Sequence, residues 1–287
     1  RWRHQGDSNP WYPTLRISRQ AKAGDWNPVI TEICHALRQQ TSRNGDMDDK
    51  TRLLISLREL DGQPQATRAL IGAYLKQHPS TADIWNLLGT TCFDLGQLDA
   101  AFAAFATALK FQPHYPEALY NQGNTHYTAG HYDDARTTWQ KALKQDPQIS
   151  QANYNLGLLS QEQGRLNEAA DHYQRELEID PHHADAGLNL GEILREAGRL
   201  DEAIAHLQQF RKLHPRHPGA ATTLAAVLTL THRLEEAGET YREAVALDPQ
   251  SPRSWNNLGA IHYRRCDYDS SREAYEKALA LDADHAD

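Results

Sequence analysis

The stretch Pro116–Ile149, PEALYNQGNTHYTAGHYDDARTTWQKALKQDPQI, carries the pattern that decides the fold. Pro147, near the end of this stretch, belongs to a series of prolines that are each 34 residues apart. Ala283 occupies the next position of the series. Counted from Asp48, seven units of 34 residues reach His285. A fixed period of this length is typical of helical repeat proteins. The prolines are Pro79, Pro113, Pro147, Pro181, Pro215 and Pro249.

Other positions keep the same period. One column is mostly glycine, and small residues let two helix backbones approach closely. Another column is mostly large and fills the space between neighbouring helices. The small column is Ile55, Gly89, Gly123, Gly157, Gly191, Ala225 and Gly259, and the large column is Ile71, Phe105, Trp139, Tyr173, Leu207, Tyr241 and Tyr275.

Each unit is predicted to contain two short helices. In the unit that begins at Ala82, apolar or small residues from Trp85 to Cys92 follow helical spacing, and Gly96 then ends the first helix. The second helix ends before Pro113, which cannot donate a helical hydrogen bond. His232 and Cys266 replace the turn glycine in the last two units, so we expect those turns to be more strained or differently shaped.

These columns resemble the tetratricopeptide repeat (TPR), and the unit 116–149 shows the resemblance best. The resemblance implies an all-α fold, a right-handed superhelical solenoid of about seven 34-residue helix-turn-helix repeats. Ile55 replaces the small residue in the first unit, which is therefore degenerate and could act as a cap. The predicted repeats are 48–81, 82–115, 116–149, 150–183, 184–217, 218–251 and 252–285.

The first 47 residues break the period. They carry seven Lys or Arg against four Asp or Glu, and Pro28–Gln39 is predicted to form one helix. Residues 1–40, which include the run Ser8–Arg16, are similar to the C-terminal tail of a bacterial TPR-associated glycosyltransferase domain. Two interpretations stay open: a remnant of such an upstream domain, or an ordinary helix docked on the first repeat. Because the chain begins at Arg1, we expect it to be a segment of a longer polypeptide.

Composition narrows the function classes. The formal net charge of -8 disfavours nucleic acid as a partner. We find no apolar stretch of the length a membrane helix needs, so no membrane partner is predicted. Cys34, Cys92 and Cys266 are far apart and suit a reducing compartment, which predicts a cytoplasmic location.

Catalytic and metal-binding motifs are not recognised in the sequence. The histidines fall in loops or in packing columns, and His126 is assigned a packing role. We therefore predict no catalytic residue, no cofactor and no metal for this segment. Whether a parent chain is an enzyme stays open, because a glycosyltransferase domain could precede the repeats.

Amides occupy one column of the first helices: Asn121, Asn155, Asn189 and Asn257. Asparagine both donates and accepts hydrogen bonds, so a ladder of such residues can bind the backbone of an extended peptide. The TPR resemblance implies that this face lines a concave groove. The alternative is that Asn is merely tolerated at this helix position and that the tyrosines pack along the wall. The flanking candidates are Asn86, Tyr120, Asn124, Tyr127, Tyr154, Glu192, Arg195 and Tyr263.

Three functional hypotheses follow. The first is a protein-interaction scaffold that binds extended peptides or partner proteins in the groove. The second is the substrate-presenting TPR arm of a larger protein glycosyltransferase similar to O-GlcNAc transferase. The third is self-association through the uncapped C-terminal repeat, Tyr275–Leu281.

Overall fold

The computed structural model describes residues 8–9, 12–16, 49–50, 53–54, 57, 63–149 and 151–283. The chain divides into two compact units, Arg1–Pro147 and Gln148–Asp287. This division falls beside the predicted repeat boundary at 149/150. The predicted repeat boundaries and the boundary at residue 47 stay predictions.

The N-terminal segment contains a short antiparallel pair of strands, β1 (Ser8–Asn9) and β2 (Tyr12–Arg16). Ser8 pairs with Arg16 and Asn9 with Tyr12, and the register shifts between the two pairs. The predicted helix Pro28–Gln39 lies outside the described residues.

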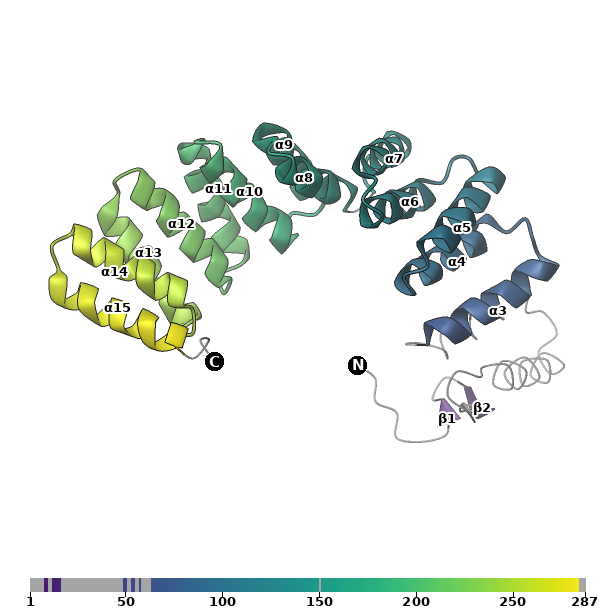
Figure 1. Cartoon of the computed structure of the whole chain (residues 1–287), viewed down its shortest axis with the longest axis horizontal. Coiled ribbons are helices and arrows are strands. Elements are labelled where there is room, and N and C mark those ends of the chain that lie inside the picture. Colours follow the sequence, from purple (N-terminus) through teal and green to yellow (C-terminus); the bar gives the residue numbers. More distant parts are fainter. Residues whose placement is uncertain are drawn as a thin grey trace. The chain divides into compact units, whose positions relative to one another are not determined.

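Consecutive helices pack against each other within each unit (Figure 1). The all-α expectation for the repeats is confirmed. The helices of the first unit are α3 (Pro64–Gln77), α4 (Ala82–Asp94), α5 (Leu98–Phe111), α6 (Pro116–Thr128) and α7 (Tyr132–Gln145). Those of the second unit are α8 (Ala152–Glu162), α9 (Leu166–Ile179), α10 (Ala184–Glu196), α11 (Leu200–Leu213), α12 (Pro218–Leu230), α13 (Leu234–Leu247), α14 (Pro252–Arg264) and α15 (Tyr268–Ala283).

Five of the six helix pairs are held by a glycine in the first helix and a large side chain sixteen residues later in the second, and the pair α12–α13 has Ala225 in place of the glycine. A Cβ atom added to Gly123 would lie 2.4 Å from Trp139 Cδ1, so the indole occupies the space that any other residue would fill. Trp139 is fully buried by this contact. The small column and the large column of the sequence are therefore the two halves of one contact. The same contact joins Gly89 to Phe105, Gly157 to Tyr173, Gly191 to Leu207 and Gly259 to Tyr275.

The same hydrogen bond closes the turn inside each pair. The backbone N–H of the residue after the turn residue donates to the carbonyl oxygen five residues earlier in the chain. His131 N donates to His126 O at 2.9 Å, which is the bond of a Schellman turn. The residue before the donor is left-handed, as at Gly130 with φ of 79°. Cys266 adopts φ of 61° and keeps the same hydrogen bond, from Asp267 N. Of the two expected alternatives, the strain of a left-handed non-glycine residue is the one present, and the turn keeps its hydrogen bond.

One helix starts differently from its equivalents. α8 begins at Ala152, two residues later in its repeat than α6 or α10, and Gln151 before it is left-handed with φ of 68°. The buried carboxylate of Glu176 accepts hydrogen bonds from the backbone N–H groups of Gln151, at 2.9 Å, and Tyr154, at 3.3 Å. A carboxylate suits the positive end of a helix. Glu176 therefore compensates for the two residues that α8 lacks at its start.

Replacing Gly123 with alanine should destabilise the fold by about 1–3 kcal/mol, because the new methyl group would displace Trp139 in a fully packed core. Gly72 of α3 is the matched control. The space that a methyl group would take at Gly72 is open to a distance of 4 Å, so Gly72→Ala should stabilise its helix by roughly 0.5–1 kcal/mol. Urea denaturation followed by circular dichroism measures both changes. Equal effects of the two substitutions would contradict the packing argument.

Replacing His232 with glycine should stabilise the second unit by about 0.5–1 kcal/mol. The left-handed backbone, with φ of 59°, costs a side chain roughly 1–2 kcal/mol, and part of that gain is offset by the entropy of glycine in the unfolded chain. The reverse change, Gly164→Ala, should destabilise it. Denaturation midpoints of the two variants and the unaltered chain test the pair, and a shift of the same sign in both would exclude turn strain as the cause.

Candidate functional site

The candidate amides lie on the first helix of successive pairs, and all four are half-buried. Asn121 is on α6, Asn155 on α8, Asn189 on α10 and Asn257 on α14. Asn121 Nδ2 donates to Asn86 Oδ1 of α4 at 3.1 Å. Two predicted site residues from consecutive first helices are therefore in direct contact.

The remaining candidates of the first unit surround this amide pair. Tyr115, which precedes α6, shares a hydrogen bond with Asn86, and burial raises the pKa of this tyrosine. Trp139 Nε1 donates to Asn124 Oδ1 at 3.0 Å. The ring of Tyr127 lies 5.8 Å from that of Trp139, so it packs on the helix pair. Tyr120 is half-buried on the same helix.

In the second unit, Tyr173 of α9 connects the candidates of the two helices beside it. Its hydroxyl donates to Gln161 Oε1 at 2.7 Å and lies 3.5 Å from Asn189 Nδ2, which donates to it. Tyr154 of α8 packs on Tyr173, with 5.9 Å between ring centroids, and also bonds Asn189. Burial raises the pKa of both tyrosines, so their hydroxyl groups stay protonated near neutral pH.

The remaining candidates are the charged residues Glu192 and Arg195 and the exposed Tyr263. Thr223 of α12, which interrupts the amide column, donates to Glu192 Oε1 at 3.4 Å. Arg195 forms an ion pair of 3.5 Å with its neighbour Glu196. Tyr263 is 61% exposed and contacts Tyr268, so it lies at the margin of the face rather than within it.

The structure thus brings together Asn86 with Asn121, and Tyr154 with Asn189. Tyr120 and Tyr127 belong to the first compact unit and Tyr154 to the second. An asparagine side chain can form about four hydrogen bonds, which is more than those described for Asn121 and Asn189. The arrangement can present polar groups at fixed spacing.

Sequence reasoning missed the residues that organise the candidates. Tyr115 lies between two predicted helices, and no periodic signal marks it. The large column assigns Tyr173 to packing alone, although its hydroxyl bonds Gln161 and Asn189. A buried tyrosine usually needs a partner for its hydroxyl, and that expectation could have located this network.

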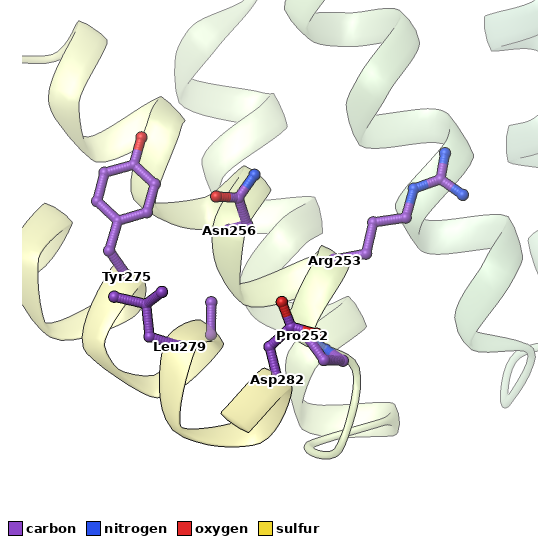
Figure 2. Close-up of a pocket in the computed structure, with 7 residues that line it drawn as sticks. Pro252, Arg253, Asn256, Tyr275, Leu279 and Asp282 are labelled. Atoms are coloured by element: carbon purple, nitrogen blue, oxygen red, sulfur yellow. The ribbon is translucent and has the colours of Figure 1, made fainter. Parts of the chain in front are cut away.

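A shallow groove of about 380 Å³ lies between α14 and α15. Figure 2 shows Tyr275, Leu279 and Asp282 of α15 beside Asn256 and Pro252 of α14. Leu279 is 68% exposed, whereas Val245, at the equivalent position of α13, is 7% exposed because α14 packs on that helix. The predicted exposure of this end is confirmed for Leu279.

Cys92 is buried and Cys266 exposed, and both are free thiols. Among the described residues, we find no helix with the length and apolar character that crossing a bilayer requires. The cytoplasmic location stays a prediction.

Comparison with protein families identifies the repeat. Models described as "Tetratricopeptide repeat" match residues 120–184, 160–228, 194–261 and 252–285, and one described as "TPR repeat" matches 89–130. The chain belongs to the tetratricopeptide-repeat family. The matched residues begin at 89, so the resemblance of residues 1–40 to a glycosyltransferase tail stays a prediction. No curated protein matches the sequence.

Solved TPR structures resemble this one at low identity. MamA is 24% identical with a TM-score of 0.54, over 57% of this chain and 96% of its own. YrrB, described as a TPR protein with an unusual peptide-binding site, is 21% identical with a TM-score of 0.57, over 64% of this chain and 95% of its own. A TPR protein from Parabacteroides merdae is 17% identical with a TM-score of 0.54, over 80% and 91%. These likenesses confirm the all-α repeat solenoid.

Proposed function

We propose that this TPR chain is a protein-interaction scaffold that binds extended peptide segments on the amide-bearing face of its first helices. The observation that carries the proposal is the hydrogen bond between Asn86 and Asn121. It places two polar side chains from successive repeats on one face, at a distance that a single ligand can span.

The chemistry of these residues suits a peptide backbone. Each peptide unit offers one N–H donor and one C=O acceptor, and an asparagine amide can pair with both. The bonds that hold Asn189 to Tyr173 and Tyr154 fix its side chain before a ligand arrives. A preorganised side chain loses less entropy on binding. YrrB, a TPR protein of similar fold, is described as having a peptide-binding site, which supports the same class of ligand here.

The double substitution Asn155→Ala with Asn189→Ala should weaken peptide binding by about tenfold or more, because each lost hydrogen bond contributes roughly 0.5–1.5 kcal/mol. Peptides are first selected from a random display library with the whole chain as bait. Their dissociation constants are then measured by fluorescence anisotropy for each variant.

The matched control is Gln174→Ala with Gln208→Ala, which removes two exposed amides from the second helices α9 and α11. It should leave the affinity unchanged. Circular dichroism should give the same helix content for both double variants. Equal affinities of the two variants, or a library that yields no binding peptide, would contradict the proposal.

A second candidate function, association with a second copy of the chain, rests on the exposed Leu279 of the end groove. Burying this side chain against another copy would remove apolar surface from water. Light scattering of the unaltered chain should show a mass that rises with concentration, and Leu279→Lys should abolish the rise. The control Leu213→Lys alters an exposed leucine of α11 away from the groove. A constant monomer mass of the unaltered chain would exclude this candidate.

A further inference from the structure

Three residues with metal-binding side chains meet at the turn of the 116–149 repeat. His126 lies in the last turn of α6, His131 precedes α7 and Asp134 lies in its first turn. One ligand atom from each side chain lies within 4.8 Å of the ligand atoms of the other two. The set contains two imidazoles and one carboxylate.

The turn itself brings the two histidines together. His131 N donates to His126 O, so the residues are joined through their backbones although five positions separate them. Gly130 between them is left-handed and closes the turn. The backbone therefore fixes the spacing of the two histidine residues before any metal arrives, although the exposed His131 ring can still rotate.

Equivalent positions of other repeats carry different chemistry. Where this repeat has His131 and Asp134, the three following repeats have ion pairs: Arg165–Glu168, Arg199–Glu202 and Arg233–Glu236. Where it has His126, the same repeats have Ser160, Leu194 and Leu228. All three candidate ligands thus occur together in this repeat, on a backbone whose turn has the same closing hydrogen bond as the others.

The last repeat provides a contrast. His262 and Asp267 occupy the positions of His126 and His131, and they form a pair of 3.0 Å. The third position, equivalent to Asp134, is Ser270. This repeat has two of the side chains but lacks the third carboxylate or imidazole.

His126 has an unsatisfied polar atom. Its Nδ1 is buried and has no hydrogen-bond partner among the described residues, while its ring lies 4.6 Å from that of Phe102. A buried nitrogen without a partner is unfavourable and calls for an explanation. Burial also lowers the pKa of His126.

We propose that His126, His131 and Asp134 form a binding site for a divalent transition metal, with zinc as the reference ion. Imidazole and carboxylate ligands suit zinc and its neighbours in the first transition series. Three protein ligands leave one position of a tetrahedral zinc ion for water or for a group from a partner. The site would connect α6 to α7 across their turn.

Binding of a zinc ion requires the three ligand atoms to move slightly closer together. Zinc lies about 2.0–2.2 Å from nitrogen and oxygen ligands, so two of its ligand atoms are at most about 4.4 Å apart. Distances of up to 4.8 Å must therefore shorten. His131 and Asp134 are exposed and can rotate, whereas the half-buried His126 stays in place against Phe102.

The test compares the whole chain with a variant in which His131→Arg and Asp134→Glu recreate the ion pair of the following repeats. This variant should fold, because three other turns carry the same pair. Zinc affinity is measured by competition with a chromophoric chelator, and thermal unfolding is followed with and without zinc chloride. A second variant, His126→Ser, introduces the residue found at position 160.

The unaltered chain should bind one zinc ion tightly, and each variant should bind it at least about tenfold more weakly. Zinc should raise the melting temperature of the unaltered chain more than that of either variant, because the metal stabilises the form that binds it. The control is His262→Ala, in the repeat that has two of the side chains. This variant should still bind one zinc ion per chain as tightly as the unaltered chain. Absence of tight binding, its retention in both variants, or its loss in the control would overturn the proposal.

Discussion

The contact between a glycine of the first helix and a large side chain of the second supports five of the six helix pairs. Gly123 and Trp139 show how tightly this contact constrains the sequence. The indole ring of Trp139 fills the volume that a Cβ atom at position 123 would take, so the ring sets the distance between the two helix backbones. Interiors are packed as densely as organic crystals, so this distance has little freedom. Once it is set in successive repeats of one unit, side chains 35 residues apart, such as Asn86 and Asn121, can meet.

Much of this architecture could be predicted from spacing alone. Period, column and turn signals located the paired helices, because each signal is a local requirement repeated many times. Residues that break a column could not be predicted in the same way. Glu176 occupies a position that is alanine in the preceding repeat, at Ala142, and its carboxylate holds the start of α8. The repeat period could not predict the role of Glu176, because its partner is the start of α8, which itself departs from the period.

The candidate site was partly predictable for a related reason. The sequence identifies Asn189 as one member of a column, but the structure adds Tyr173, which the large column assigns to the core. A tyrosine serves both roles, since its ring packs and its hydroxyl bonds. Likewise, the sequence assigns His126 to packing because only the folded turn places His131 and Asp134 beside it.

The hydrogen bond that closes each turn has a consequence for how such chains diversify. It joins backbone atoms, so it persists whether the turn residue is Gly130, His232 or Cys266. Duplicated copies of a module can then diverge at their turns while the helices stay under strict selection for packing. The exposed ion pairs there contribute little to stability, so exchanging one costs little. In such a tandem array, the turns are where a single copy is freest to acquire chemistry that its siblings lack.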